Sequence, residues 1–136
     1  MIVDERFLTY LRSLEGQEID YIAAIEKEAL ETYVPIIRKD TQTFMKFLMQ
    51  TLRPGQILEV GTAVGFSPLL MEAYDPADCQ ITTIENYLPR IPIARANFAR
   101  AKKEACIHLI EGDAQEVLPT LTGSYDFIFM DAAKGQ

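Results

Sequence analysis

The chain has 136 residues, of which 49% are hydrophobic, and a formal net charge of −7, so it suits one domain, or most of one, that can bury a core. No stretch approaches the roughly 20 uncharged apolar residues of a membrane span, and the N-terminus lacks the basic and apolar regions of a signal peptide. We therefore expect a cytoplasmic protein with no membrane partner, and the acidic balance excludes an overall basic field for nucleic acid while leaving a local basic patch open.

The first third of the chain is predicted to be helical. Apolar residues at helical spacing predict one helix over residues 4–14, a second over 18–32, and a third that is capped by Asp40 or Thr41 and ends near Leu52. The inward stripes are predicted to be Ile22, Ile25, Ala29 and Tyr33 in the second helix, and Phe44, Phe47, Leu48 and Leu52 in the third.

These helices suggest how the chain is organised. We expect residues 1–53 to cover the sheet and the pocket, and residues 54–136 to form the cofactor-binding half of a single structural domain. The link over residues 34–39 places apolar residues beside basic ones, and we expect it to border the pocket.

The rest of the chain is organised around residues 57–67, which read ILEVGTAVGFS. This pattern predicts a buried strand, a tight turn and a helix, with Gly61 and Gly65 where a side chain would obstruct the turn or a ligand. The N–H groups that open such a helix lack partners within it, so we expect the loop to bind a polar or anionic group. A dinucleotide site would need a third glycine where Phe66 stands, which argues against a nicotinamide oxidoreductase.

Three further predicted strands end in acidic residues. The strand over 80–85 ends at Glu85, which in a nucleoside-binding α/β fold can accept hydrogen bonds from both ribose hydroxyls. The strand over 107–111 is followed by Asp113, which can accept from an adenine amino group and also cap the next helix. The strand over 125–131 is almost entirely apolar, as expected of a strand covered on both faces, and delivers Asp131. We expect these strand ends to meet at one edge of the sheet.

The histidine and the two cysteines of the chain are not predicted to form a catalytic or metal site. The single histidine, His108, falls inside a predicted strand, and we expect it to be packed or at the surface rather than catalytic. Cys79 and Cys106 are not closely spaced, which suits reduced, packed thiols better than a disulfide or a zinc site.

Five short segments, taken in order, resemble the metal-dependent class I O-methyltransferases of the catechol and caffeoyl-CoA type. They are VPII at 34–37, the stretch 57–67, TIE at 83–85, EGDA at 111–114 and FMDAAKGQ at 129–136. The resemblance implies a Rossmann-like α/β fold, with helices on both faces of a parallel sheet, here ending after the fourth strand. The chain also resembles the bacterial tRNA 5-hydroxyuridine methyltransferases in its brief N-terminal part.

The resemblance also implies roles for individual residues. S-adenosylmethionine is expected to contact Asp131 and the other residues of a cofactor-binding set. That set is Ile37, Glu59, Gly61, Thr62, Gly65, Ser67, Glu85, Asp113 and Ala114. Asp131 would also be a ligand of Mg²⁺, and Lys134 would lie near the substrate hydroxyl, so these two are the candidate catalytic residues.

Two alternatives stay open for the function. The first is a magnesium-assisted O-methyltransferase acting on tRNA 5-hydroxyuridine or on a small catechol-like phenol. RNA phosphates could then meet basic residues, namely Arg38, Lys39, Arg90, Arg95, Lys102 and Lys103, which otherwise form an ordinary solvated surface. The second is a catalytically incomplete cofactor-binding fragment, because the family pattern continues beyond Gln136 with further metal ligands. We expect the chain to be the first part of a methyltransferase and to form a homo-oligomer through the exposed edge of its fourth strand.

Overall fold

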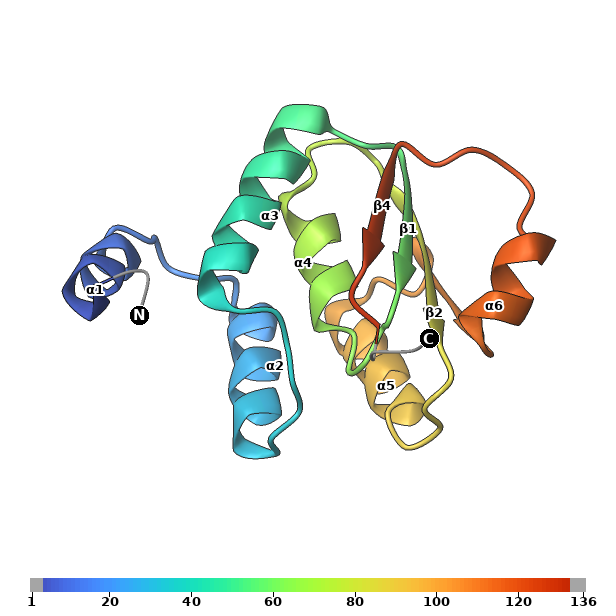
Figure 1. Ribbon diagram of the computed structural model, residues 1–136, viewed down its shortest axis with the longest axis horizontal. Helices are drawn as coiled ribbons and strands as arrows, with labels where there is room; N and C mark the ends of the chain where they lie inside the picture. The colour runs from blue at the N-terminus through green and yellow to red at the C-terminus, as the bar shows by residue number, and fades with distance from the viewer. Residues whose placement is uncertain (1–3, 133–136) are drawn as a thin grey trace.

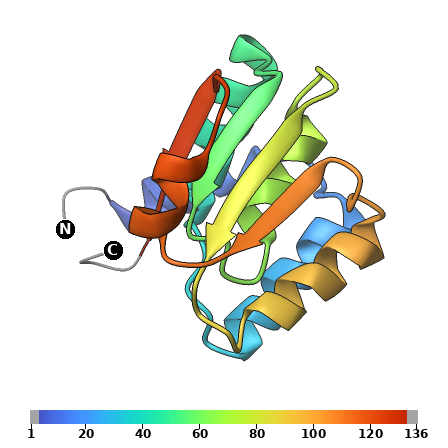
Figure 2. The same ribbon diagram turned by 90° about the vertical axis from the view of Figure 1, so that its right-hand side faces the viewer.

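The structure, a computed structural model, describes residues 4–132. Four parallel strands form one sheet in the order β3-β2-β1-β4 (Figure 1). Their bounds are β1 Gln56–Val60, β2 Gln80–Glu85, β3 Ile107–Glu111 and β4 Phe127–Met130. Figure 2 shows the strands side by side with their carboxyl ends at the same edge. The sheet confirms the predicted Rossmann-like α/β class, and its register places the ends of β1 and β2 next to each other, since Val60 pairs with Ile84.

Helices lie on both faces of the sheet, but unequally. One face carries α2 (Asp20–Glu31), α3 (Lys39–Leu52), α4 (Phe66–Tyr74) and α5 (Ile91–Ala101). The other face carries the short helix α6 (Ala114–Val117) and the 3-10 helix η1 (Leu118–Thr120), seen alone on the right of Figure 1. Within residues 4–132, no helix has the length and apolar character that a membrane span needs.

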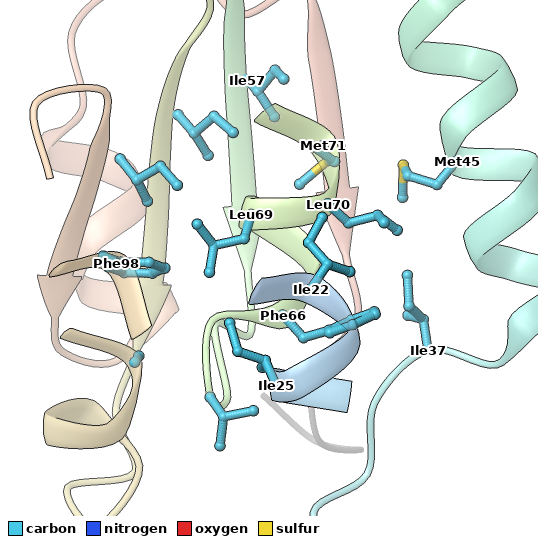
Figure 3. Close-up of a cluster of buried hydrophobic side chains, with 14 of the residues drawn as sticks. Ile22, Ile25, Ile37, Met45, Ile57, Phe66, Leu69, Leu70, Met71 and Phe98 are labelled. Atoms are coloured by element: carbon cyan, nitrogen blue, oxygen red, sulfur yellow. The ribbon is translucent and has the colours of Figure 1, made fainter. Parts of the chain in front are cut away.

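The main core lies between the sheet and the larger helical layer. Leu69, Leu70 and Met71 of α4 are fully buried at its centre, between the strands and Ile22 of α2 (Figure 3). The helix α4 is apolar on almost every side because it is sandwiched between the sheet and other helices. This packing fixes the start of α4, and with it the loop that follows β1.

The helix α3 differs from its prediction in two respects. It begins at Lys39 after Arg38, so Asp40 lies in the first turn instead of capping the helix, and Thr41 does not cap it either. Its buried residues are Gln42, Met45 and Met49, while the predicted stripe is largely exposed, with Phe44 and Phe47 each 59% exposed and Leu52 56% exposed. Both stripes have helical spacing, so periodicity alone did not decide between them. Gln42 Nε2 donates to the Ile37 carbonyl at 2.9 Å and to Glu26 Oε1 at 3.1 Å, which turns its own side of α3 inward.

The other N-terminal helices agree more closely with expectation. The predicted stripe of α2 is confirmed at Ile22, Ile25 and Ala29, but Tyr33 lies beyond the end of the helix with a φ of 55° and is 93% exposed. The first helix, α1 (Glu5–Ser13), contributes no buried residue, and Figure 1 shows it apart from the sheet. The covering of the sheet by this part of the chain therefore comes from α2 and α3.

The strand β4 lies at an edge of the sheet within the described residues. Phe127 and Phe129 pack against the main core, whereas Ile128 is 57% exposed and Met130 is 63% exposed. The expectation that β4 is covered on both faces is thus met on one face only. The smaller cluster around α6 packs on Leu58, Val60 and Ile84 of the two central strands.

Candidate functional site

A cavity at the carboxyl edge of the sheet has a volume of about 380 Å³. It is lined from three strand ends, by Gly61 and Ala63 after β1, by Glu85 to Tyr87 at the end of β2, and by Asp131 and Ala132 after β4. Pro35, Ile36 and Arg90 complete the lining. The link over residues 34–39 therefore borders the cavity, as the sequence predicts, and this volume falls within the range of about 300–1,000 Å³ common for small-molecule sites.

A smaller cavity of about 40 Å³ adjoins the first. Both cavities are lined by Pro35, Ile36, Gly61, Ala63 and Asp131, and the smaller one adds Ile37, Thr62, Phe66 and Ser67. Six predicted cofactor residues thus line one or both cavities, namely Ile37, Gly61, Thr62, Ser67, Glu85 and Asp131.

The backbone N–H groups of the loop after β1 donate to other groups of the chain. The N–H groups of Gly61 and Thr62 both donate to the Ile84 carbonyl, at 2.9 and 3.2 Å, and Gly65 N–H donates to the Thr62 carbonyl at 2.8 Å. Ala63 N–H donates to Glu85 at 2.7 Å. These four hydrogen bonds fix the loop next to β2, and the expected binding of a polar or anionic group by the N–H groups that open α4 stays a prediction.

Glu85 is buried and lines the larger cavity. Its Oε2 accepts from Ala63 N–H at 2.7 Å, and its Oε1 accepts from the N–H groups of Asn86 at 3.0 Å and Tyr87 at 2.9 Å. Three backbone donors therefore fix the direction of this carboxylate. Each carboxylate oxygen has two lone pairs, so Oε1 is fully used and Oε2 keeps one acceptor position for a hydroxyl group of a ligand.

Glu59 lies behind the smaller cavity and lines neither cavity, which corrects its predicted direct contact with the cofactor. The side chain is fully buried. Its Oε1 accepts from Ser67 Oγ, and its Oε2 accepts from Thr83 Oγ1 at 2.5 Å; Thr83 Oγ1 lies 2.6 Å from Thr62 Oγ1. One carboxylate thereby ties together the first turn of α4, β2 and the loop after β1.

The environment of Glu59 disfavours its charged form. Burial raises the pKa of Glu59 to about 7, the hydrogen bonds from Ser67 and Thr83 oppose that rise, and the charges of Asp131 and Glu85 add to it. The two charges that add to this rise, Asp131 and Glu85, are the two carboxylates that line the larger cavity, which Arg90 also lines.

Two predicted cofactor glycines serve different purposes. Gly61 has a φ of 102° and lines both cavities. Gly65 has a φ of 84°, but a Cβ there would lie 2.6 Å from Phe98 Cε1, so its missing side chain makes room for α5. Gly65 lines neither cavity, so the structure supports a packing role for it, and its contact with the cofactor stays a prediction.

Asp113 and Ala114 lie at the neighbouring strand end. Gly112 N–H donates to the Glu85 carbonyl at 3.0 Å, which brings the end of β3 beside β2. Asp113 Oδ1 accepts from Gln115 N–H at 2.8 Å, so the predicted capping role is confirmed. Neither residue lines either of the two cavities, and their contact with an adenine ring stays a prediction.

Of the two candidate catalytic residues, Asp131 is among the described residues and Lys134 is not. Asp131 lines both cavities, and its N–H donates to the Val60 carbonyl at 3.1 Å. Among residues 4–132, no group of three His, Cys, Asp or Glu side chains is arranged to hold a metal ion. Asp131 alone does not make a Mg²⁺ site, because that ion needs several oxygen ligands in octahedral geometry. Lys134 lies outside the described residues.

Three cavity residues were not singled out for this site from sequence, namely Asn86, Tyr87 and Arg90. The sequence feature that could have identified them is their position in the loop that follows Glu85 and β2. The Arg90 guanidinium lies over the Tyr87 ring, with 5.0 Å between Cζ and the ring centroid, which is a cation–π arrangement.

Half of the basic residues considered for RNA are paired within the chain. Lys39 pairs with Glu26, Arg95 with Glu111 and Lys103 with Glu72, each at 2.7 Å. These pairs favour the ordinary solvated surface over a phosphate contact at those three positions.

The remaining reactive side chains agree with expectation. His108 is exposed, with Nε2 2.8 Å from Gln80 Oε1. Cys79 and Cys106 are free thiols, and burial raises the pKa of Cys79 to about 12.

Comparison with known proteins places this geometry in a family. Residues 13–136 match the family model described as O-methyltransferase. The catechol O-methyltransferase of Niastella koreensis is 30% identical over 131 residues, which cover 92% of this chain and 59% of the relative. The crystal structure of a caffeoyl-CoA O-methyltransferase described as putative, from Staphylococcus aureus, superposes with a TM-score of 0.82 at 32% identity, covering 96% of this chain and 61% of that one.

A second solved structure carries a bound ligand. The SAH-bound methyltransferase PaMTH1 of Podospora anserina superposes with a TM-score of 0.84 at 27% identity, covering 94% of this chain and 56% of that one. The chain thus spans less than two thirds of the length of these relatives. The family model nevertheless covers nearly all of it, and the chain belongs to the O-methyltransferase family.

Proposed function

We propose that this chain forms the cofactor-binding part of an S-adenosylmethionine-dependent O-methyltransferase. The observation that carries the proposal is the convergence of Glu85, Gly61 and Asp131 from three strand ends on one cavity of about 380 Å³. A relative of known structure, PaMTH1, holds SAH, which supports the same ligand class here. S-adenosylmethionine supplies an electrophilic methyl group on a positively charged sulfur.

The residues of the chain suit such a molecule in three ways. The buried Glu85 carboxylate, held by three backbone N–H groups, keeps one acceptor position on Oε2 for a ribose hydroxyl. Gly61 leaves room at the turn, and the two carboxylates of the lining, Glu85 and Asp131, outnumber its one positive charge, Arg90, which favours a cationic ligand. Methyl transfer requires an in-line arrangement of acceptor oxygen, methyl and sulfur, so the main contribution of these residues is to hold the cofactor in one orientation.

The acceptor is proposed to carry a hydroxyl group. The two candidates are tRNA 5-hydroxyuridine and a small catechol-like phenol, and the relative from Niastella koreensis, named a catechol O-methyltransferase, favours the phenol. The alternative is a cofactor-binding fragment without turnover. It is supported by the lack of a complete metal site among residues 4–132. There, Asp131 is the one candidate Mg²⁺ ligand at the cavity, and no group of three His, Cys, Asp or Glu side chains is arranged to hold a metal ion.

Magnesium dependence is proposed for the whole protein only. The described residues do not by themselves fit a Mg²⁺ site, and no step here depends on the ion. If Asp131 is a metal ligand in the whole protein, Asp131→Ala should lower turnover more than cofactor binding. Equal turnover in the variant would contradict the assignment.

Two measurements test the proposal. Titration calorimetry with S-adenosylhomocysteine (SAH) should show binding, and NADH should show none; the reverse would support an oxidoreductase. Methyl transfer to hydroxyuridine-containing tRNA and to a catechol, each with and without Mg²⁺, should then show which acceptor is used. Binding of SAH without turnover on either acceptor would favour the non-catalytic alternative.

A further inference from the structure

The buried side chain of Gln42 on α3 acts only as a hydrogen-bond donor. Its Nε2 donates to the Ile37 carbonyl at 2.9 Å and to Glu26 Oε1 at 3.1 Å. Both partners can only accept, so the amide nitrogen, and not the amide oxygen, has to face them. Gln42 Oε1 is buried and has no hydrogen-bond partner within residues 4–132. Both amide hydrogens are therefore used, and the amide oxygen is not.

Packing alone does not explain a glutamine at this position. Gln42 shares the buried side of α3 with Met45 and Met49, and methionine is an unbranched apolar side chain that fills irregular gaps in a core. A buried acceptor without a partner is unfavourable, so a third methionine would suit the core. What the glutamine adds is its pair of N–H donors, which hold the Ile37 carbonyl and Glu26.

The Ile37 carbonyl belongs to the link over residues 34–39, which forms one wall of both cavities at the carboxyl edge of the sheet. Pro35 and Ile36 line both cavities, and Ile37 lines the smaller one. Neither Pro35 nor Ile36 makes a hydrogen bond to another described residue. The hydrogen bonds that position this wall are therefore those at its two ends.

The two ends of the link are held differently. At the α2 end, Val34 N–H donates to the Ala29 carbonyl at 2.9 Å. At the α3 end, Gln42 binds two successive carbonyls, Arg38 through its backbone N–H at 2.8 Å and Ile37 through its side chain. Of these hydrogen bonds, the one to Ile37 depends on which side chain stands at position 42.

Glu26 joins the same arrangement to α2. Its Oε1 accepts from Gln42, and its Oε2 pairs with Lys39 at 2.7 Å. The side chain of Glu26 is 13% exposed, so this ion pair is shielded from solvent on the Glu26 side. Glu26 lies in α2 and Lys39 is the first residue of α3, so one carboxylate connects the helices on both sides of the link.

We infer that Gln42 is a positioning residue that holds the link against the two cavities and slows the dissociation of the ligand bound there. The inference rests on the proposed binding of S-adenosylmethionine. Gln42 lines neither cavity, so it acts on the ligand only through the link, whose Pro35 and Ile36 line both. A wall that covers a bound molecule has to move before that molecule leaves, and the hydrogen bond to Ile37 opposes the movement.

Amide hydrogen exchange tests the link without any ligand. Gln42→Met removes both donors and keeps a long, unbranched side chain. Exchange at Val34, the bonded amide at the α2 end of the link, should become roughly two- to tenfold faster, since one net hydrogen bond no longer opposes opening. Exchange at Leu70, which is fully buried in α4, should stay unchanged. Gln50→Met, at an exposed glutamine of α3, is the matched control and should change neither amide.

Surface plasmon resonance with SAH tests the effect on the ligand. Gln42→Met should raise the dissociation rate constant by roughly two- to tenfold, which corresponds to the loss of one net hydrogen bond. It should not lower the association rate constant, because a less firmly held wall does not obstruct entry. A lower association rate with an unchanged dissociation rate would indicate a distorted cavity and would overturn the inference. So would exchange that becomes equally faster at Val34 and at Leu70, which is the mark of a general structural role.

A double variant tests whether Gln42 and Glu26 act together. Glu26→Ala removes the second acceptor of Gln42 and the partner of Lys39, so it should also raise the dissociation rate constant, though by less than Gln42→Met. In the Gln42→Met background it should add little, because the bond between the two side chains is already absent. An equal effect of Glu26→Ala in both backgrounds would contradict the joint action of the two residues.

The outcomes also distinguish this inference from the proposed function. If the unmodified chain does not bind SAH, the proposed function fails, and exchange at Val34 still decides whether Gln42 holds the link. If it binds SAH and Gln42→Met releases SAH at the same rate, the inference alone fails. Gln42→Leu, which is also apolar, takes the place of Gln42→Met if that variant does not fold. Loss of folding in both variants would make Gln42 a requirement of the whole fold and would refute a specific role at the link.

Discussion

The missing side chain of Gly61 is what allows the end of β4 to lie against the loop after β1. A Cβ on Gly61 would be 2.7 Å from the carbonyl oxygen of Asp131 and 3.3 Å from Ala132 Cα. The φ of 102° at Gly61 is also one that L-residues rarely adopt. This glycine therefore sets the distance between two of the three strand ends that form the cavity.

Gly61→Ala should consequently disturb both stability and ligand binding. We expect a loss of at least about 2 kcal/mol in the free energy of unfolding, because the new Cβ meets backbone atoms, which cannot move as a side chain can, at a strained φ. Urea titration followed by circular dichroism measures this loss. Gly16→Ala is the matched control, because nothing lies within 4 Å of a Cβ there. Similar curves for the two variants would show that the approach of Asp131 to Gly61 is not close.

Removal of the Glu85 carboxylate should weaken SAH binding without unfolding the chain. We expect Glu85→Ala to cost roughly 1.5–3 kcal/mol of binding free energy, because a hydrogen bond from a ribose hydroxyl to a charged acceptor is lost. Calorimetry with SAH measures the change in dissociation constant.

A control for Glu85 stands at the next strand end. Glu111 pairs in register with Glu85, but it is exposed and bonds to Arg95. Glu111→Ala should leave SAH binding unchanged. Equal losses in the two variants would mean that net charge at the edge of the sheet, and not a ribose contact, attracts the ligand.

The buried Glu59 should make stability depend on pH. Its pKa is about 7 in the folded chain against 4.5 as the reference value, so between those values the folded state holds a proton that the unfolded state has lost. The contribution of Glu59 to stability is therefore fully present below pH 4.5 and is lost as the pH rises to about 7, by on the order of 3 kcal/mol.

The measurement is a difference between two proteins. The free energy of unfolding of the unmodified chain, minus that of Glu59→Gln, should fall as the pH is raised through this interval and then level off. Glutamine does not titrate, so groups common to both proteins largely cancel. A difference that stays constant with pH would show that Glu59 titrates with an ordinary pKa despite its burial.

Much of the site could be predicted from the sequence, because parallel strands bring their carboxyl ends to one edge. Glu85, Gly61 and Asp131 were each identifiable as the residue that follows or ends an apolar run, and the structure brings them to one cavity. Glu59 was identified as important for the wrong reason. Whether a carboxylate points into a cavity or into the protein depends on side chains such as Thr83 on another strand. Spacing within one segment does not determine that partner.

The same limit explains the error in the buried face of α3. Phe44 and Met45 belong to two stripes with equal periodicity, and the contact of Gln42 with the Ile37 carbonyl favours the second. The loop after β1 depends on another strand in the same way, because the Ile84 carbonyl on β2 accepts from two of its N–H groups. In each case the deciding atom lies in a different segment of the chain.

The edge strand β4 leads to a prediction about assembly. Within residues 4–132, β1 is the strand neighbour of β4, and the opposite side of β4 has no strand. The side chains of Ile128 and Met130 on this strand are exposed, and apolar edge strands tend to pair with other chains. We expect the chain to self-associate through this edge, with a sedimentation coefficient that rises with concentration.

Ile128→Lys should reduce that association, because a charge on an edge strand opposes pairing with a second strand. Leu30→Lys is the control, since Leu30 is 63% exposed on α2 and Ile128 is 57% exposed on β4, so both changes place a lysine at a similarly exposed apolar position. Association that survives Ile128→Lys but is lost in Leu30→Lys would place the interface on the helical layer. A folded unmodified chain that sediments as a monomer at every concentration would contradict the prediction, and would mean that the exposed side chains of β4 do not recruit a partner copy.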